Sequence, residues 1–528
     1  MRASALHEPF LDQAEARPDA VAIVDGDRKV TYGELAGTVL RTAAVLRELG
    51  VGRGDRVAIW LEKSIEAVSA MLASSCAGGV YVPLDPGSPP ARAAKILRSC
   101  EPAVVLVGPR TAGAWRECAA AAGAARVAWG GAEGEPPAGL EAVPLRAAAA
   151  SAAPEPPAAV AGDAPAHILF TSGSTGQPKG VVITHANVLA FVAWANSYFD
   201  VRPGDRHSGH SPLFFDLSTY DIYGSLSAGA ELHLVPPRLN LLPGKLAEFI
   251  RERRLTQWFS VPSILNYLAK FDAVGEGDFP EMKRLMWCGE VFPTPSLRYF
   301  MARLPHVRFT NLYGPTEATI ASSYYTVPAV PASDREEIPI GSPCGGEELF
   351  VVGEDGRVLP PGRTGELWIA GVGVAAGYWR DPERTAQAFV PHPQRPGERA
   401  YRTGDLARQG EDGLFYYLGR SDSQIKSRGY RIELGEIEAA LAAVPWLREA
   451  AVVAVPTDGF EGWSICCAYV PQRGREAPPR EIKAALARDL PAYMIPHRFR
   501  AWDALPRTPN GKVDRKAIRA AFAAADAG

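Results

Sequence analysis

Hydrophobic positions in the first part of the chain switch between two spacings. Residues 33–49 place apolar side chains at helical intervals, residues 56–60 form a short apolar run, and residues 65–76 return to the helical spacing. A short apolar run between two helical patterns is typical of a buried strand. The alternation predicts βα units around a largely parallel sheet, and therefore an α/β fold.

Two later regions have different patterns. Between residues 341 and 418, glycines and prolines separate short β-branched and aromatic runs, which predicts a β-rich subdomain. After Asp422 come a helical pattern (434–441), two strand patterns (450–455 and 465–470) and another helical pattern (481–490), the content of a small α+β domain. We therefore expect a large N-terminal domain, residues 1–421, and a small mobile C-terminal domain, residues 422–528.

A loop rich in hydroxyl groups and glycine lies at residues 171–180, with the sequence Thr-Ser-Gly-Ser-Thr-Gly-Gln-Pro-Lys-Gly. The apolar runs 166–170 and 181–183 predict a strand on each side, so the loop is expected at the tip of a hairpin. Gly173 and Gly176 can let backbone N–H groups converge on an anion, and the hydroxyls and Lys179 add donors. Because Pro178 precedes the lysine and a strand follows, this is not the Walker loop. A plain surface loop is the alternative, but the flanking strands favour a phosphate site.

Composition narrows the function further. The chain has 528 residues, 47% of them hydrophobic, with a net charge of −3 and a pI of 6.4, so nothing indicates binding to nucleic acid or to an anionic membrane. No segment approaches about 18 uninterrupted apolar residues, and no signal peptide is evident, which favours a cytoplasmic protein. The seven cysteines lack metal-binding spacing, and we expect them to be reduced core residues.

A series of motifs in fixed order resembles the adenylation domains of nonribosomal peptide synthetases, which belong with acyl-CoA synthetases and luciferases to the adenylate-forming superfamily. After the phosphate loop, the motifs are Phe215-Asp-Leu-Ser218, Asn311-Leu-Tyr-Gly-Pro-Thr-Glu317, Tyr401-Arg-Thr-Gly-Asp-Leu406, Gly419-Arg-Ser-Asp-Ser-Gln-Ile-Lys426 and Asn510-Gly-Lys-Val-Asp-Arg515. The resemblance covers nearly the whole chain.

The resemblance implies an ATP site and a catalytic lysine. Glu317 would bind Mg²⁺, Tyr313 would stack on adenine, Asp405 would accept hydrogen bonds from the ribose, and Lys512 would bridge the substrate carboxylate and the α-phosphate. A point charge there stabilises the charge that develops during transfer. The full set of implied ATP-binding residues is Thr171, Ser172, Gly173, Ser174, Thr175, Gly176, Lys179, Asn311, Tyr313, Gly314, Thr316, Asp405 and Arg420.

Each of these residues has an ordinary alternative. Taken singly, Asp405 would be a turn or helix-cap residue, Tyr313 a half-buried aromatic, and Arg420 or Lys512 a solvated surface charge. Their occurrence together, in the family's order, favours the catalytic interpretation.

The same resemblance maps an amino-acid pocket, which Lys512 would close. Its implied lining is Asp216, Leu217, Tyr220, Phe259, Met286, Cys288, Leu312, Ile320 and Ala321. Asp216 is the informative member, because a partly buried carboxylate needs a cationic partner and the ammonium of an α-amino acid supplies one. The other positions carry no charge and suit a small side chain.

The pocket is similar to those of stand-alone prolyl adenylating enzymes, so L-proline is the first expectation, with alanine, cysteine and serine as alternatives. An acyl-CoA synthetase and a catalytically silent amino-acid-binding protein are further alternatives. Asp216 disfavours the former, and the presence of Lys512 and Glu317 disfavours the latter.

The resemblance also implies a second half-reaction. Rotation about the hinge residue Asp422 would withdraw Lys512 and turn residues 426–429 toward the phosphopantetheine arm of a carrier protein. Because only a short alanine-rich tail follows Arg515, we expect a free-standing enzyme and a separate peptidyl carrier protein. A basic surface near Arg428, Arg431 or Arg498 would suit an acidic carrier, although these charges are equally compatible with plain solvation.

Overall fold

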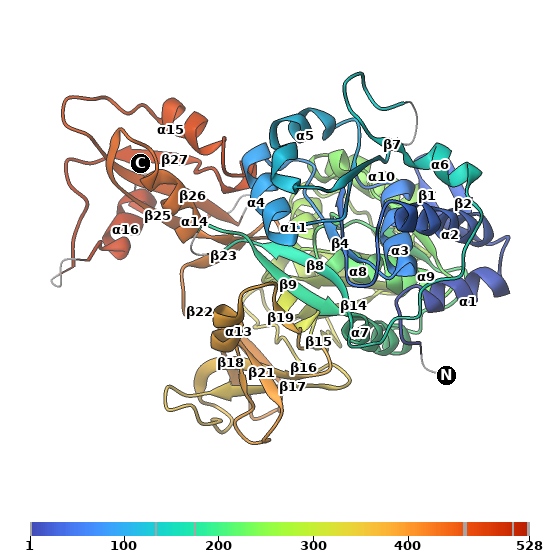
Figure 1. Ribbon diagram of the computed structural model, residues 1–528. Coiled ribbons are helices and arrows are strands. Elements are labelled where there is room, and N and C mark those ends of the chain that lie inside the picture. Colours follow the sequence, from blue (N-terminus) through green and yellow to red (C-terminus); the bar gives the residue numbers. More distant parts are fainter. Residues whose placement is uncertain (1–2, 132–134, 174–175, 458–461, 509–511, 525–528) are drawn as a thin grey trace.

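The computed structural model describes residues 3–131, 135–173, 176–457, 462–508 and 512–524, and consists of a large body, a β-rich subdomain and a separate C-terminal lobe (Figure 1). The large body contains a nine-stranded sheet in the order β16-β15-β14-β13-β12-β10-β11-β1-β2. The central neighbours from β14 to β1 pair in parallel, and the strands at both edges are antiparallel. The bounds are β1 (Val21–Asp25), β2 (Arg28–Thr31), β10 (Arg206–Gly209), β11 (Glu231–Leu234), β12 (Gln257–Ser260), β13 (Arg284–Cys288), β14 (Arg308–Tyr313), β15 (Ser323–Thr326) and β16 (Ser342–Pro343).

A second, eight-stranded sheet has the order β19-β9-β8-β4-β3-β5-β6-β7. Its strands β3 to β8 pair in parallel, as the βα pattern of the sequence predicts. The bounds are β3 (Arg56–Trp60), β4 (Val80–Pro83), β5 (Val104–Val107), β6 (Arg126–Trp129), β7 (Val143–Pro144), β8 (Pro165–Thr171), β9 (Lys179–Thr184) and β19 (Gly377–Tyr378).

The helices of the large body cover and join these sheets. They are α1 (Glu8–Ala16), α2 (Tyr32–Glu48), α3 (Ile65–Ala77), α4 (Pro90–Cys100), α5 (Ala112–Cys118), α6 (Leu145–Ser151), α7 (His185–Tyr198), α8 (Leu217–Thr219), α9 (Ser225–Ser227), α10 (Pro243–Glu252), α11 (Pro262–Lys270) and α12 (Thr294–Arg303), with the short turns η1 (Ala119–Ala122), η2 (Tyr220–Gly224), η3 (Pro237–Leu241) and η4 (Thr316–Ala318).

Two helices show how the sequence builds this core. A capping box starts α2, because the Thr31 hydroxyl accepts from the Glu34 N–H and the Glu34 carboxylate accepts from the Thr31 N–H. In α3, every residue from 67 to 77 is buried, and Gly78 ends the helix in the left-handed conformation. A helix that is apolar all round belongs in the interior, and α3 packs against α2, with residues of both sheets in the same cluster.

The β-rich subdomain predicted at residues 341–418 is present. Its five strands are β17 (Glu347–Val352), β18 (Thr364–Gly371), β20 (Phe389–Pro391), β21 (Arg399–Gln409) and β22 (Phe415–Arg420), accompanied by α13 (Pro382–Ala388).

The C-terminal lobe has the predicted α+β content. A two-stranded hairpin, β23 (Gln424–Ser427) and β24 (Tyr430–Glu433), precedes a three-stranded sheet and its helices. The lobe's other elements are α14 (Leu434–Ala442), β25 (Leu447–Pro456), β26 (Trp463–Pro471), α15 (Pro479–Leu486), η5 (Ala492–Met494), β27 (Arg498–Ala501) and α16 (Arg515–Ala524).

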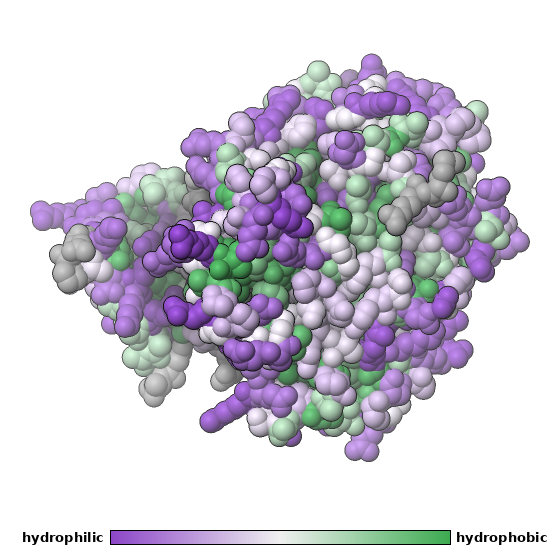
Figure 2. Space-filling model, turned by 90° about the horizontal axis from the view of Figure 1, so that it is seen from below, coloured by the Kyte–Doolittle hydropathy of each residue, from purple (hydrophilic) through white to green (hydrophobic). Residues whose placement is uncertain are grey.

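Surface and cysteine features agree with the composition. On the face seen from below, hydrophilic and hydrophobic residues are interspersed, and the hydrophobic ones gather mainly in one compact area left of centre (Figure 2). All seven cysteines are buried, as expected, and no disulfide joins any of them in the described part of the chain. Among the described residues, no helix has the length and hydropathy needed to cross a membrane.

Candidate active site

The phosphate loop lies at the tip of the β8–β9 hairpin, as predicted. The antiparallel pairing runs up to Phe170 opposite Gly180 and Thr171 opposite Lys179. Gly176 has a φ of +75°, and a Cβ on Gly173 would lie 2.2 Å from the carbonyl oxygen of Gln177. Both positions therefore require glycine. Two further residues of the predicted site, Ser174 and Thr175, lie outside the described residues.

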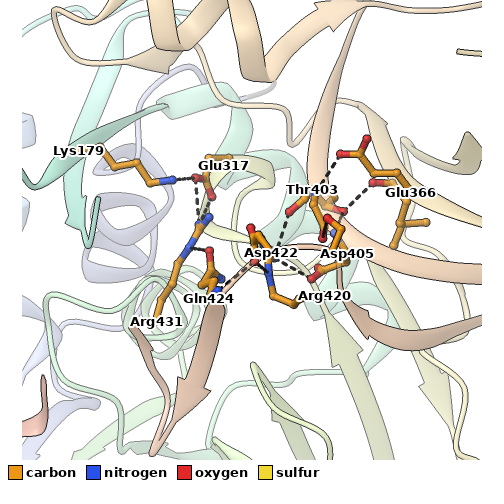
Figure 3. Close-up of polar contacts among 12 residues, drawn as sticks. Lys179, Glu317, Glu366, Thr403, Asp405, Arg420, Asp422, Gln424 and Arg431 are labelled. Atoms are coloured by element: carbon orange, nitrogen blue, oxygen red, sulfur yellow. Dashed lines mark hydrogen bonds and ion pairs between the residues drawn. The ribbon is translucent and has the colours of Figure 1, made fainter. Parts of the chain in front are cut away.

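Glu317 lies in η4, the turn that follows β14, and its side chain is completely buried. Its carboxylate accepts hydrogen bonds from the Arg431 guanidinium at 2.7 and 3.0 Å and from the Tyr378 hydroxyl at 2.8 Å. The Lys179 ammonium lies 3.1 Å away (Figure 3). Burial raises the pKa of Glu317, but Arg431 and Lys179 outweigh burial and hold this pKa well below its usual value. The group is therefore an anion at neutral pH.

This carboxylate suits a magnesium ion. Mg²⁺ in phosphate-transfer sites is typically held by one or two carboxylates together with substrate phosphates, rather than by a closed protein cage. In the part of the chain that the structure describes, no group of three or more His, Cys, Asp or Glu side chains is placed to hold a metal. Glu317, beside the phosphate loop, is the residue that fits.

The backbone just after Glu317 is strained. Thr319 and Ile320 have φ values of +56° and +70°, in the left-handed region that β-branched residues rarely adopt. The Thr319 hydroxyl donates to the carbonyl of Gly373 at 2.6 Å, and the Ile320 side chain is buried, so the surrounding structure holds this conformation. Such strain is typical of functional sites, and the sequence pattern gave no sign of it.

The predicted ribose-binding residues lie together beside β21. Asp405 is buried and accepts hydrogen bonds from Arg420 at 2.7 Å and from the Tyr313 hydroxyl. Its two carboxylate oxygens are thus held in fixed directions. Asn311, also predicted for the ATP site, donates to the Pro339 carbonyl at 2.9 Å. At Gly314 a Cβ would lie 2.5 Å from the Cα of Ala321, so only glycine fits.

Asp216 lies at a cavity between the large body and the C-terminal lobe. It accepts a hydrogen bond from the Thr316 hydroxyl at 2.6 Å, and burial raises its pKa. The cavity has a volume of about 110 Å³, and its walls include Leu217, Cys288 and Gly314 from the large body. Asp216 therefore contacts Thr316, the residue that directly precedes Glu317 in the sequence.

The remaining predicted pocket residues lie behind the cavity wall. Strand register places Phe259 beside Met286 and Cys288 beside Leu312, and Tyr220 crosses Phe259 with ring centroids 6.0 Å apart. Together with Ile320 and Ala321 they belong to one buried cluster. The structure thus brings the predicted set together, but only Asp216, Leu217 and Cys288 reach the cavity itself.

A π-helical turn, η2, supports this region. In η2, Gly224 lies directly under the Tyr220 ring, where a Cβ would be 2.5 Å from the ring carbons. π-Turns are rare and often occur at functional sites. The sequence interpretation missed this feature because a π-turn has no distinct hydrophobic period.

Lys512 does not close the cavity in this structure, contrary to the expectation. Its side chain is exposed, its carbonyl accepts a hydrogen bond from the Thr508 N–H at 2.7 Å, and it is absent from the cavity walls. The C-terminal lobe instead presents the β23–β24 hairpin, with Lys426, Gly429 and Arg431 at the cavity. The physical reason is that the hairpin and the Lys512 loop belong to one lobe, which turns only one of them toward the site.

The predicted hinge is held by ion pairs. Arg420 donates to both carboxylate oxygens of Asp422, at 2.8 and 2.6 Å, while also holding Asp405. Gln424 links this pair to Arg431, whose Nε donates to the Gln424 side chain at 2.8 Å (Figure 3). A continuous polar chain therefore connects Asp405 to Glu317.

The sequence interpretation missed or misplaced two members of the site. Arg431 was considered for a carrier-docking surface, but its guanidinium points inward to Glu317 and only 16% of its side chain is exposed. Tyr378 was not assigned a role. The nearest signal for Arg431 was its position two residues after the segment 426–429, which was expected to face the phosphopantetheine arm of the carrier protein.

Comparison with known proteins supplies the family. Residues 10–379 match the model described as "AMP-binding enzyme", and residues 436–512 match "AMP-binding enzyme C-terminal domain". A protein of Pseudomonas fluorescens named L-proline–[L-prolyl-carrier protein] ligase is 37% identical over 97% of this chain and 98% of its own length. One of the same name from Streptomyces coelicolor is 38% identical over 96% of this chain and 94% of its own.

A solved structure of an adenylation-domain protein is similar to this chain over nearly its whole length. A nonribosomal peptide synthetase protein containing adenylation and PCP domains, bound to a vinylsulfonamide inhibitor, superposes with a TM-score of 0.81 at 29% identity, covering 98% of this chain and 84% of the other.

Proposed function

The chain belongs to the AMP-binding enzyme family, and on that premise we propose that it activates a small uncharged amino acid, L-proline first, and transfers it to a carrier protein. In the first half-reaction an amino-acid carboxylate oxygen attacks the α-phosphorus of ATP, and the bond to pyrophosphate breaks. In the second, a phosphopantetheine thiol attacks the aminoacyl carbonyl and AMP leaves.

The observation that carries this proposal is the contact between Asp216 and Thr316, the neighbour of Glu317. It puts a carboxylate able to pair with an α-ammonium next to the groups suited to metal and phosphate. A buried carboxylate without a cation is costly, so a substrate that brings its own ammonium is favoured over a simple acid.

Proline is preferred for two reasons. Two relatives similar over nearly their full length carry prolyl-carrier ligase names. The predicted pocket residues behind Asp216, such as Tyr220 and Phe259, are uncharged and fully buried, which suits a small uncharged substrate side chain. Alanine, cysteine and serine remain the nearest alternatives, because one methylene changes selectivity by only ~1–3 kcal/mol.

The proposed roles are those that the resemblance implies, and the contacts around Glu317 and Asp405 support them. The phosphate loop and Lys179 hold the β- and γ-phosphates, and Asp405 with Arg420 positions the ribose. Glu317 would hold Mg²⁺, which offsets phosphate charge when bound. Lys512 acts when the lobe turns its loop inward, about a hinge at Asp422 that separates residues 1–421 from 422–528.

The test is ATP–pyrophosphate exchange with a panel of proline, alanine, cysteine, serine, valine and simple carboxylic acids. We expect exchange with proline above all other acids. Exchange only with acids lacking an ammonium would favour an acyl-CoA synthetase and overturn the Asp216 argument. Binding of an amino acid without any exchange would favour a silent binding protein.

A further inference from the structure

Asn196, near the end of α7, contacts both the π-turn η2 and the aromatic ring that follows Asp216 along the chain. Its side-chain amide donates to the Gly224 carbonyl at 2.9 Å and to the Ser227 hydroxyl at 3.1 Å. Its amide oxygen accepts from the Tyr220 hydroxyl at 3.3 Å. Because a carbonyl can only accept, the amide nitrogen must face Gly224, and the amide oxygen is left to face the ring hydroxyl. One side chain therefore joins the turn to the ring.

The Gly224 carbonyl needs this contact because the π-turn removes its usual partner. In a regular α-helix it would accept from the N–H of Ala228, four residues further on. The Ala228 N–H donates instead to the Ser225 carbonyl at 3.1 Å. The Ser227 hydroxyl reaches the Gly224 carbonyl at 3.3 Å, so Asn196 is the nearer donor. Since Gly224 is buried, loss of this donor would leave the turn poorly satisfied.

The Tyr220 ring is held by close packing as well as by its hydroxyl. Phe191 and Phe259 meet it edge-on, with ring centroids 5.5 and 6.0 Å away, and a Cβ at Gly224 would lie 2.5 Å from its carbons. The side chain is completely buried, and burial raises the pKa of its hydroxyl above the usual value, so the hydroxyl is a neutral donor. Asn196 is the acceptor that determines where this donor points.

The ring lies behind the place proposed for the substrate side chain. Asp216 and Tyr220 are four residues apart in a continuous helical stretch, so their side chains lie on the same face. Strand register puts Phe259 beside Met286, and Cys288, two residues further along β13, lines the cavity at Asp216. The two rings therefore form the inner end of the site, and a longer substrate side chain would have to displace them.

We infer that Asn196 is a positioning residue that determines substrate specificity: it supports the π-turn, accepts the Tyr220 hydroxyl, and so keeps the ring where it excludes side chains longer than that of proline. This inference rests on the proposed function and deepens it, because it names a residue that limits the size of the substrate. Asn196 lies outside the cavity walls and acts through Tyr220.

The test compares substrate selectivity in ATP–pyrophosphate exchange by the full chain. kcat/KM is measured for proline and for leucine, whose side chain is longer, in the wild type and in Asn196→Ala. We expect the proline-to-leucine ratio of kcat/KM to fall about tenfold in the variant, the low end of what one methylene contributes to discrimination. The change should lie mainly in KM. A purely structural role would lower kcat/KM for both substrates alike and leave the ratio unchanged.

Two further variants make the test specific. Tyr220→Phe removes only the hydroxyl and keeps the ring, so it should lower the same ratio in the same direction. Because the two side chains are in contact, the double variant should fall no further than Asn196→Ala alone. Asn266→Ala in α11 is the matched control, because Asn266 accepts from the Ser296 hydroxyl at 2.6 Å and lies outside the cavity walls. It should lower stability without changing the ratio.

An unchanged ratio in Asn196→Ala would overturn the inference, and so would an equal fall in Asn266→Ala. If Asn196→Ala does not fold, Tyr220→Phe decides, and an unchanged ratio there would overturn it. Equal use of proline and leucine by the wild type would do the same. In each of these cases exchange with proline leaves the proposed function standing.

Calorimetric titration with proline and leucine, without ATP, separates the inference from the proposed function. If the wild type shows no exchange, the ratio of the two dissociation constants replaces the kinetic ratio. A shift of this ratio in Asn196→Ala would then support the inference while the proposed function fails. An unchanged ratio, or no binding of either amino acid, would overturn both.

Discussion

At the residue scale, Asp216 is the group on which the proposed substrate class depends. Burial raises its pKa, whereas pairing with an ammonium requires the ionised form. Amino-acid binding should therefore be complete above this raised pKa and weaken as the pH falls through it. Folding stability without substrate should depend on pH in the opposite direction. Because burial disfavours the ionised carboxylate, the stability that Asp216 contributes falls as the pH rises through the same range.

Replacement of Asp216 by Asn tests this directly. We expect KM for proline to rise at least ~30-fold, equivalent to about 2 kcal/mol, because the substrate ammonium loses its charged partner. The acidic limb of the pH profile of KM should disappear as well. Asp200→Asn is the control, since the Asp200 side chain is 69% exposed. A KM that stays within twofold of the wild type would rule out this role.

Lys512 is predicted to act in the first half-reaction although it is exposed in this arrangement. Lys512→Ala should lower proline-dependent exchange by about 10²–10³-fold, the usual effect of removing a group that stabilises transition-state charge. Thermal stability should not change, because the side chain is exposed. Lys516→Ala, also exposed and four positions later, is the matched control. Equal exchange rates in the two variants would contradict the assignment.

Residue-scale features were predictable where motifs are local. The hairpin loop at residues 171–180 was predicted from its short pattern of glycine and hydroxyl residues, whereas the roles expected for Glu317 and Asp405 came from the resemblance to the adenylation domains. The cysteines were expected in the core because their spacing suits no metal site. The Arg431–Glu317 pair was not, because its partners are separated by more than one hundred residues and by a lobe orientation. Sequence spacing carries no information about such an orientation.

At the element scale, the π-turn η2 determines where the Tyr220 ring lies. Gly224→Ala would place a Cβ 2.5 Å from that ring, which is fully buried and has no free direction to move. We expect a loss of about 1–3 kcal/mol in unfolding free energy, the usual cost of overpacking, and a raised KM for proline.

The control for this substitution is Gly244→Ala in α10. A Cβ at Gly244 meets no atom within 4 Å, so stability should be unchanged or slightly raised. Denaturant unfolding of both variants makes the comparison. If Gly224→Ala were as stable as the wild type with the same KM, close packing at η2 would have no role in the pocket.

Elements with a clear period were predicted well. The helix expected at 33–49 is α2 (Tyr32–Glu48), and the strand at 56–60 is β3 (Arg56–Trp60). The helix expected at 481–490 ends earlier, at Leu486. Leu490 stays buried although it lies past that end, so apolar spacing alone extended the predicted helix.

At the scale of the whole molecule, the proposed function needs two arrangements of the C-terminal lobe. Asp422→Pro would fix φ near −65° and restrict rotation at the proposed hinge. We expect overall carrier loading to fall at least ~10-fold, because at most one half-reaction keeps its arrangement. Exchange and carrier loading should be measured separately.

Asp422→Asn distinguishes the backbone from the charge. It weakens the pair with Arg420 but leaves the backbone free, so it should retain both half-reactions far better than the proline variant. If both variants lost activity equally, the ion pair rather than the rotation would explain the effect. Full activity of Asp422→Pro in both half-reactions would place the hinge elsewhere.

Identification of the nucleotide product tests the proposed function most directly. The protein is incubated with ATP, Mg²⁺ and proline, and the bound species are measured by mass spectrometry. We expect a proline-dependent prolyl-adenylate, with pyrophosphate released. Formation of ADP with a prolyl phosphate, or no proline-dependent nucleotide product, would contradict it.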